Sequence, residues 1–491
     1  MNIIESAVKM INTVLWDYVL LFGLVFLGVY LSIKLKFPQF KRVFIAFKNL
    51  IKGIIKKEEV PEGRMTPFQS LSTAIAAQVG TGNIIGVATA IAAGGPGAAF
   101  WMIVSAFFGM STIFAEAVLA QKYREYHDGQ LVGGPAYYIK NGLKSKFMAN
   151  IFAIFCVIAL GFVGIMVQSN SVSVSVSESF SISKLAVAIG LAIIVALILT
   201  GGMKRIAKFT EIVVPFMAFA YIIASIVLII IFRQNFVSAI SLIFIGAFKP
   251  QAIAGGALGI GVQQAMRFGV ARGLFSNEAG MGSTPHSHAV ASTDHPAEQG
   301  FIAMIGVFIS TFLICMSTVM VSLSSHSYDP SVSAEVMSKT AALMTQKGFF
   351  LTYGSFGEKF LSVSLSFFSL TTIVGWYFFA EGNIKMLFNG DKKVISIFKV
   401  IVIFALFYGS FLKAGFVWQL ADCAMGLMAL PNIIALFLLS KQVKEILNDY
   451  DKQKAKGEEL HYDYEFEKND YEIEECENSK ENSKIDEKAY S

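Results

Sequence analysis

The chain has 491 residues, of which 55% are hydrophobic and 15% are charged, with a formal net charge of +5. Soluble domains carry about 25% charged residues, so this composition excludes an ordinary soluble protein and predicts a polytopic membrane protein. The positive charge does not indicate nucleic-acid binding, because the basic residues flank apolar runs.

Apolar runs of about 20 residues, the length that crosses a bilayer, predict an all-α protein with eleven transmembrane helices. An early run at Tyr18–Ile33 gives the first helix. The other ten are expected at Leu71–Ala93, Ala98–Gln121, Ile151–Ser171, Leu185–Gly202, Ile212–Phe232, Ala254–Ala291 (broken), Phe301–Ser324, Phe360–Met386, Val394–Phe411 and Phe416–Ser440.

Lysine and arginine near the helix ends predict how the chain crosses the membrane. The loop after the first helix is basic, and every second connection after it is basic again. The N-terminus is therefore expected outside and the C-terminus in the cytoplasm of a multi-pass cell-membrane protein. Glu5 precedes the first apolar run and no small-residue cleavage site follows it, so no cleavable signal peptide is expected.

Two of the apolar runs are interrupted by small and polar residues, at Gly80-Thr81-Gly82-Asn83 and at Phe275–Ser283. Broken backbone at membrane depth is tolerated where it lines a protein cavity, and in transporters that cavity binds solute and ions. Each break is preceded by an amphipathic stretch, Phe40–Lys57 or Phe236–Phe248, and begins a set of five spans. Because the two broken helices run in opposite directions, we expect a 5+5 inverted repeat.

The expected organisation has five parts. They are an extra N-terminal transmembrane helix (1–38), a basic cytoplasmic amphipathic segment (39–65), the first repeat (66–235), the second repeat (236–440) and a charged cytoplasmic tail (441–491). The tail is acidic and poor in apolar residues, which predicts disorder. The sequence predicts no oligomeric state.

The first break offers two kinds of ligand at its gap. The N–H groups of Thr81, Gly82 and Asn83 are suited to a carboxylate, while carbonyls near Ala76 and Val79 are suited to a sodium ion. The alternative is a glycine-rich helix crossing, which is common where membrane helices pack closely. The second break favours the binding-site interpretation.

Polar and aromatic residues in other spans extend this site. Gln168 can orient a polar ligand or only join helices. The hydroxyls of Thr371 and Thr372 can supply oxygen to a hard cation, or can bond the carbonyl one turn back. Phe275 and Trp376 can wall the pocket, or be ordinary packing.

The few ionisable residues at membrane depth are expected to face the interior and to form pairs. We expect Glu278 to pair with Arg272 or Arg267, in a structural or gating role rather than as a proton carrier. His286 and His288 are two positions apart and point to different sides of a helix, which disfavours a metal site. The four cysteines are scattered, which predicts neither a disulfide framework nor a metal site.

Four segments carry a family resemblance: GTGNIIGVATAIAAGGPGAAFWM, GVARGLFSNEAGMGS (269–283), MVQSNS (166–171) and SLTTIVGW (369–376). They resemble the alanine/glycine:cation symporter family, and the resemblance extends from about Thr66 to Ser440. It implies the leucine-transporter fold of the amino acid–polyamine–cation superfamily, and sodium- or proton-coupled uptake of alanine and glycine.

The resemblance also implies roles for individual residues. Thr81, Gly82 and Asn83 match the family's substrate carboxylate site, Gln168 its substrate-contacting glutamine, and Phe275 and Trp376 its pocket aromatics. By similarity to the wider fold, the Ala76 and Val79 carbonyls and the Thr371 and Thr372 hydroxyls would form a sodium site. The chain departs from the expected pattern at Gln78, where a small or hydroxyl residue is expected, and in the histidines of Thr284–His288.

These observations predict a sodium-coupled importer of small neutral amino acids that is not an enzyme and needs no cofactor. Proton coupling is the alternative, and sodium is favoured because no lone carboxylate is expected beside the site. A non-transporting amino acid sensor is a second alternative. An intramembrane hydrolase using Ser276 or Ser283 with His286 is disfavoured, since no nucleophile motif supports it.

Overall fold

The computed structural model describes residues 3–56, 60–61, 63–127, 129–249, 261–329 and 334–464. Within these ranges the chain is helical apart from short connections and one hairpin of strands β1 (Glu125–His127) and β2 (Gln130–Val132). The first-half helices are α1 (Ile3–Val14), η1 (Leu15–Val19), α2 (Leu20–Lys34), α3 (Pro38–Lys56), α4 (Pro67–Gln78), η2 (Gly82–Gly86), α5 (Val87–Gly94), α6 (Ala98–Lys122), α7 (Pro135–Gly142), α8 (Lys146–Cys156), η3 (Val157–Gly164), α9 (Ile165–Phe180), α10 (Lys184–Leu199), α11 (Gly202–Ile231) and η4 (Arg233–Asn235). The second-half helices are α12 (Phe236–Phe248), α13 (Val262–Asn277), α14 (Pro285–Ala289), α15 (Pro296–Val307), η6 (Phe308–Cys315), α16 (Met316–Ser324), α17 (Ala334–Tyr353), α18 (Ser355–Leu387), α19 (Lys392–Gly409) and α20 (Ala414–Lys456).

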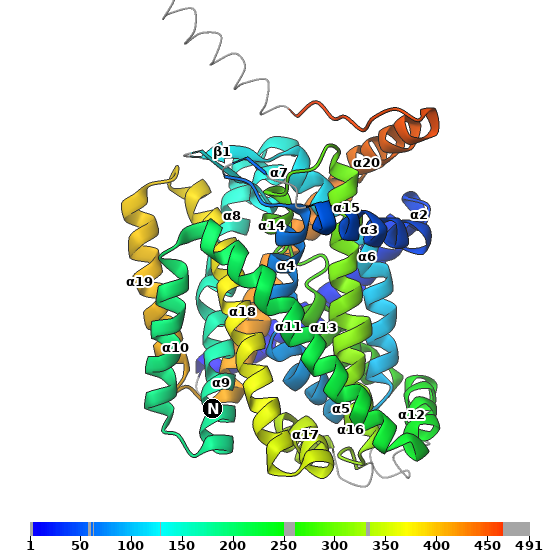
Figure 1. Ribbon diagram of the computed structural model, residues 1–491, viewed down its shortest axis with the longest axis vertical. Helices are drawn as coiled ribbons and strands as arrows, with labels where there is room; N and C mark the ends of the chain where they lie inside the picture. The colour runs from blue at the N-terminus through cyan, green and yellow to red at the C-terminus, as the bar shows by residue number, and fades with distance from the viewer. Residues whose placement is uncertain are drawn as a thin grey trace, which may run out of the picture.

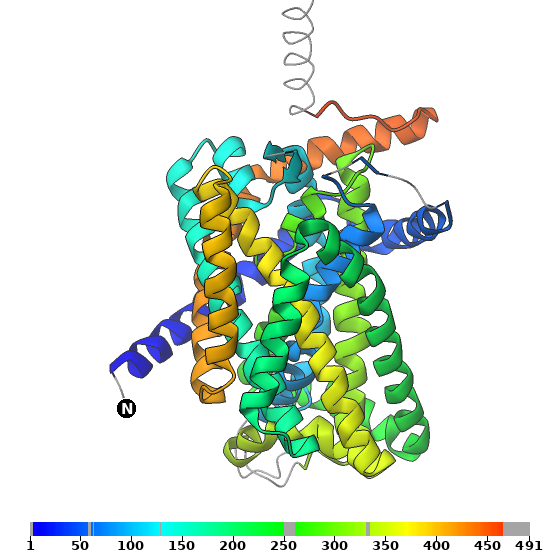
Figure 2. The same ribbon diagram turned by 60° about the vertical axis from the view of Figure 1, so that its left-hand side comes forward.

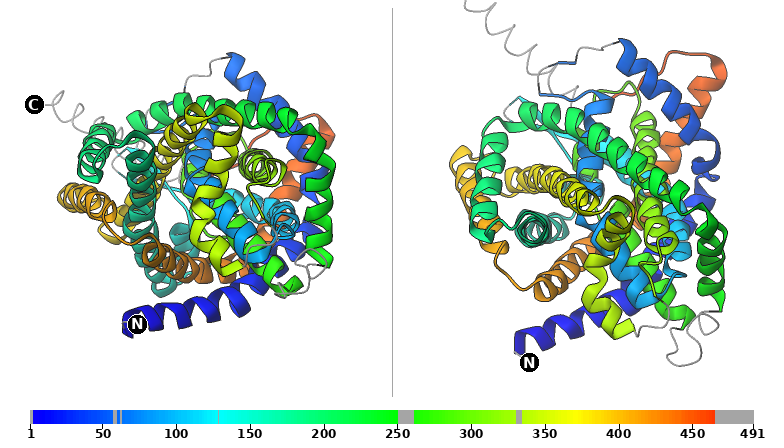
Figure 3. Two further views of the ribbon diagram at one scale, coloured as in Figure 1. Left: turned by 90° about the horizontal axis from the view of Figure 1, so that it is seen from below. Right: turned by 60° about the horizontal axis from the view of Figure 1, so that its bottom comes forward.

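The long helices form one bundle, with α4, α13 and α18 in its interior and α10 and α19 side by side at its edge (Figure 1). The N-terminal helices run along the outside of the bundle, where α2 packs on α6 and α20 (Figure 3). In Figure 2, α3 and the end of α20 lie across the long axis of the bundle. The amphipathic stretches predicted at Phe40–Lys57 and Phe236–Phe248 correspond to α3 and α12.

Seven helical segments of the described residues are long and apolar enough to cross a membrane, and the bent pair α4 and η2–α5 makes an eighth. The seven are Glu5–Lys34, Ala98–Lys122, Lys146–Phe180, Gly202–Ile231, Pro296–Ser324, Ser355–Leu387 and Gly415–Lys456. The all-helical membrane fold is therefore confirmed, whereas the count of eleven is not reached. Three further spans were predicted where α10, α19 and α13–α14 lie; α10 has 16 residues, α19 contains three lysines, and residues 254–260 lie outside the described ranges.

The first break bends its helix by 52° between α4 and η2. Helix α4 starts with a capping box in which the Thr66 hydroxyl and the Gln69 side chain bond each other's backbone N–H, and Pro67 occupies the first turn. It ends at Val79, whose backbone leaves the helical region (φ −120°, ψ 82°). The helix resumes at Gly82, so the gap falls on the predicted residues.

The second break lies between α13 and α14 and is held by a buried carboxylate of α6. Glu278, Gly280 and Gly282 all have positive φ, which ends the helix after Asn277. The freed N–H groups of Gly280 and Gly282 donate to the two carboxylate oxygens of Glu116, each over 2.9 Å. Glu116 thus replaces the helical acceptors that the break removes.

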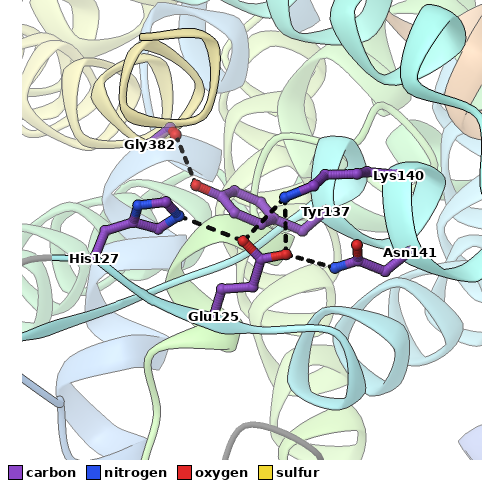
Figure 4. Close-up of polar contacts among 6 residues, drawn as sticks. All are labelled: Glu125, His127, Tyr137, Lys140, Asn141 and Gly382. Atoms are coloured by element: carbon purple, nitrogen blue, oxygen red, sulfur yellow. Dashed lines mark hydrogen bonds and ion pairs between the residues drawn. The ribbon is translucent and has the colours of Figure 1, made fainter. Parts of the chain in front are cut away.

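The hairpin closes one end of the bundle through a cluster around Glu125 (Figure 4). The Glu125 carboxylate accepts from Asn141 Nδ2 (2.7 Å) and Lys140 Nζ (3.0 Å) of α7 and lies 3.4 Å from His127 Nε2. Burial raises the pKa of Glu125, but these hydrogen bonds and the lysine charge outweigh it and lower the pKa to about 2. Tyr137 Oη donates to the Gly382 carbonyl of α18 over 3.4 Å, which connects α7 to the bundle.

The C-terminal part differs from the predicted tail. Helix α20 continues past residue 441 to Lys456, because Val443, Ile446 and Leu447 are buried against the bundle. After Gly457 the chain turns back, and Tyr464 is again buried. The tail prediction counted charges and missed this apolar helical face; residues 465–491 lie outside the described ranges.

Candidate functional site

The two breaks meet inside the bundle. Gln78 Nε2, at the end of α4, donates to the Asn277 carbonyl at the end of α13 over 2.8 Å. The Ser310 hydroxyl of η6 lies between them, 2.9 Å from the Gln78 carbonyl and 3.2 Å from the Ser276 carbonyl. The sequence analysis gives Gln78 only as a departure and does not select Ser310, although Ser310 and Thr311 are adjacent hydroxyl residues in an apolar run, the signal that selected Thr371 and Thr372.

Gln168 of α9 reaches the backbone of the first break. Its Oε1 accepts from the Thr81 N–H over 3.2 Å. A Cβ at Gly80 would lie 3.2 Å from the same amide and 2.5 Å from Thr372 Oγ1, so only glycine fits there. The Thr81 hydroxyl is buried and has no hydrogen-bond partner within the described part of the chain. The gap therefore contains the buried Thr81 hydroxyl, and beside it the Gln168 side-chain amide, which accepts from the backbone N–H of the same threonine.

Asn83 shapes the gap through its side chain. Its Oδ1 accepts from the Gly80 N–H over 3.0 Å, and its Nδ2 donates to Ser310 Oγ over 3.0 Å. The side chain thus closes a ring over the break and attaches it to η6. The sequence predicts that the Asn83 backbone N–H takes a carboxylate; in the structure this N–H donates to the Gly80 carbonyl over 3.3 Å.

Two aromatic rings cover the gap. Phe275 of α13 lies against Gly82, where a Cβ would come within 2.9 Å of the ring. Trp376 of α18 meets Phe275 edge-on, with ring centroids 6.4 Å apart. The indole also packs on Gly164, where a Cβ would come within 2.6 Å. All of these side chains are buried, so little room is left for a large ligand.

One of the two predicted threonines joins the first break. Thr372 Oγ1 lies 2.9 Å from the Ala76 carbonyl and 3.3 Å from the Val79 carbonyl. Both hydroxyls also bond the Phe368 carbonyl one turn back on α18, each over 2.9 Å; Thr371 Oγ1 bonds the Phe367 carbonyl as well and, among the described residues, has no hydrogen bond to α4. The structure brings together Ala76, Val79 and Thr372, a neutral set of oxygens suited to a hard monovalent cation, and leaves Thr371 outside it.

The predicted pairing of Glu278 with an arginine is wrong. Arg272 forms a bidentate pair with Asp422 of α20, at 2.8 Å for both contacts, and Arg267 pairs with Asp17 of η1. Both aspartates lie in or beside predicted apolar runs, and that signal was overlooked. Glu278 accepts from Trp376 Nε1 and Ser283 Oγ, each over 2.5 Å.

The histidines are held by hydrogen bonds to neighbouring elements, and Asn383 Nδ2 contacts both His286 Nε2 (2.8 Å) and Cys156 Sγ (3.1 Å). His286 Nδ1 lies 2.6 Å from the Ser283 carbonyl, and His288 Nδ1 lies 2.7 Å from Gln299 Nε2. Among the described residues, no cluster of three His, Cys, Asp or Glu side chains could hold a metal ion. Cys156, Cys315 and Cys423 are free thiols, and Cys476 lies outside the described ranges.

The comparison with known families decides the identity of this bundle. The model of the sodium:alanine symporter family matches residues 1–464. The chain belongs to the sodium:alanine symporter family. The match includes the described end of the chain at Tyr464, beyond the resemblance predicted from about Thr66 to Ser440.

Individual relatives of the sodium:alanine symporter family agree over nearly the whole chain. The sodium/alanine symporter AgcS of Methanococcus maripaludis is 37% identical over 466 residues, which covers 92% of this chain and 99% of AgcS. The probable sodium/glutamine symporter GlnT of Bacillus subtilis is 37% identical over 459 residues, with 93% of each chain covered. The family and these relatives are transporters, not enzymes.

A solved structure supports the fold. The crystal structure of MhsT in complex with L-phenylalanine superposes with a TM-score of 0.55, covering 79% of this chain and 99% of that chain at 12% identity. At this identity the likeness shows the fold alone, which is the predicted leucine-transporter fold. The division into two inverted repeats stays a prediction.

Proposed function

We propose that this protein is a sodium-coupled symporter that imports small neutral amino acids, alanine and glycine, by alternating access. The observation that carries the proposal is the first break, where carbonyls and a hydroxyl gather on one side and backbone N–H groups on the other. Thr372 approaches the Ala76 and Val79 carbonyls, and Gln168 approaches the Thr81 N–H. A cation and a carboxylate would thus bind to one short segment of chain.

The substrate carboxylate would take the N–H groups of Thr81 and Gly82 and the unpaired Thr81 hydroxyl. Gln168 Oε1 accepts from the Thr81 N–H in this structure. When substrate binds, this hydrogen bond would break, so that the N–H donates to the substrate carboxylate and Gln168 Oε1 accepts from the substrate ammonium. The relatives' names include both alanine and glutamine symporters. We favour small substrates because Phe275, Trp376 and Gly164 pack closely around the gap.

Transport would require this site to open alternately to each side. The gap residues are buried in the structure, with Thr81, Asn83 and Thr372 fully covered. Sodium and substrate can shift the balance between states only through different affinities for them. We place the protein in the cell membrane with its N-terminus outside and its C-terminus in the cytoplasm, as the loop charges predict.

Uptake of labelled alanine into proteoliposomes tests the proposal. An inward sodium gradient is compared with an equal potassium gradient at fixed pH, and uptake is expected only with sodium. N83A and W376A should each reduce uptake without loss of protein from the membrane. Normal uptake in both variants would contradict the pocket assignment, and alanine binding without flux would identify a sensor.

Proton coupling remains a second candidate on one specific observation. The preference for sodium assumed that no lone carboxylate lies beside the site, and Glu278 is such a carboxylate. If uptake persists in the potassium gradient and disappears with a proton uncoupler, the coupling ion is the proton and not sodium.

A further inference from the structure

Glu278 is a buried carboxylate at the second break. The residue is 2% exposed, and its backbone lies in the left-handed region at φ 58°. One oxygen accepts from the Trp376 indole N–H and the other from the Ser283 hydroxyl. Both donors are neutral, and no ion pair with Glu278 is found among the described residues. Glu278 therefore contacts the wall of the proposed substrate site without a countercharge.

The buried carboxylates of Glu116 and Glu278 differ in their hydrogen-bond donors. Glu116 accepts from two backbone N–H groups and from Asn432 Nδ2 (2.7 Å), which is the environment of a structural acceptor. Within the described chain, Glu278 accepts from two side chains only, and one of them is Trp376, which walls the proposed pocket. An ionised carboxylate buried without a cation is unfavourable, and such a group neutralises instead by taking a proton. Ionisable residues of this kind mark proton paths in membrane transporters.

The other titratable groups around Glu278 do not supply the missing charge. Glu116 of α6 and Cys156 of α8 lie within electrostatic range of it. His286 of α14 contacts the Ser283 carbonyl and Asn383, and its ring stacks between Phe152 and Phe379. Further groups on packed elements already have partners: Arg272 with Asp422, His288 with Gln299, and Glu381 with Lys385.

We propose that Glu278 binds the proton of a proton-coupled step, so that each substrate is carried with one proton in addition to sodium. This inference rests on the proposed amino acid transport. The proton passes from external water to a carboxylate oxygen of Glu278 and leaves that oxygen for internal water, with no other bond changed. Trp376 connects the two ligands, because its ring walls the substrate gap while its N–H bonds the carboxylate.

Lumenal pH during uptake tests this proposal. Proteoliposomes containing a trapped pH indicator receive alanine at a fixed inward sodium gradient, with the membrane potential clamped. The wild-type protein is expected to acidify the lumen as alanine enters. E278Q should abolish the acidification while alanine exchange across the membrane continues. E381Q is the matched control, because Glu381 lies on α18 in an ion pair with Lys385, and it should acidify like the wild type.

The outcomes separate the two proposals. Alanine uptake without acidification in the wild type would overturn the proton site and leave amino acid transport standing. Acidification by E278Q equal to wild type would show that another group carries the proton. Absence of amino acid uptake and exchange by a folded wild-type protein would overturn both proposals.

Two milder variants keep the test decisive if E278Q does not fold. S283A and W376F each remove one hydrogen bond to the carboxylate. Losing a donor disfavours the charged form, so the midpoint of the pH profile of uptake should move up by about one unit in each. An unchanged midpoint in both variants would overturn the proposal.

Discussion

Two adjacent threonines of α18 have different surroundings, and this separates their expected effects on sodium. Both hydroxyls bond carbonyls of their own helix, but Thr372 Oγ1 also lies at the Ala76 and Val79 carbonyls of the first break. T372A should raise the sodium concentration for half-maximal uptake by about tenfold, since a metal site loses a ligand. T371A, the matched control, should change it little. Sodium titrations of alanine uptake measure both; equal shifts would remove Thr372 from the ion site.

At the residue scale, the sequence was sufficient to select polar residues for the site, but not to predict which groups they contact. Gln168 and Thr372 could be selected because amide and hydroxyl groups are costly in apolar runs. Thr371 could not be separated from Thr372, because helix register against a distant segment is a tertiary property. The same limit explains why the predicted pairing of Glu278 with an arginine was wrong. Arg272 and Arg267, the arginines nearest to it in sequence, pair with aspartates of α20 and η1.

At the element scale, the first break depends on close contact between backbone and aromatic rings. A Cβ at Gly82 would lie 2.9 Å from the Phe275 ring, whereas one at Gly86, the other end of η2, would meet its nearest atom at 3.9 Å. G82A should therefore reduce alanine uptake at least about tenfold by displacing Phe275, and G86A should retain it. Both variants are compared by initial uptake rate per membrane-inserted protein. A G82A rate equal to that of G86A would show that the ring position does not matter.

The hairpin gives an element whose stability should depend on pH. The hydrogen bonds and lysine charge around Glu125 lower its pKa to about 2, below the usual 4.5 (Figure 4). Its contribution to stability is thus fully present above pH 4.5 and is lost as the pH falls toward 2. Proteolysis of the hairpin should become faster over that range in the wild type and depend less on pH in E125Q. A wild-type rate that is flat from pH 5 to pH 3 would contradict this.

The elements themselves were predictable to different degrees. α12 was predicted at its observed bounds, because an amphipathic stretch between polar residues is a local signal. The hairpin was not predicted, since three-residue strands give no usable periodicity. The extension of α20 to Lys456 was missed because its buried residues alternate with many charges.

At the scale of the whole molecule, the end of the described chain binds the loop that follows the second break. Tyr464 Oη donates to the Thr293 carbonyl over 3.2 Å, and the Arg124 guanidinium lies 4.1 Å from its ring. Arg124 also donates to the Ala291 carbonyl over 2.7 Å. A chain that ends after Lys456 should be about 1–2 kcal/mol less stable than one that ends after Tyr464. Thermal unfolding in detergent compares the two chains, and identical midpoints would show that this contact does not contribute to stability.

Sodium and substrate are expected to bind to neighbouring groups of one segment, which couples them. The carbonyls of Ala76 and Val79 and the N–H groups of Thr81 and Gly82 belong to the same bent backbone. Either ligand therefore orders the gap for the other, and linkage requires the two effects to be equal. Saturating sodium should raise alanine affinity by some factor between about 5 and 150, and saturating alanine should raise sodium affinity by that same factor. Equilibrium binding to purified protein measures both factors. Alanine binding that is indifferent to sodium, with sodium shown to bind, would place the ion away from the first break.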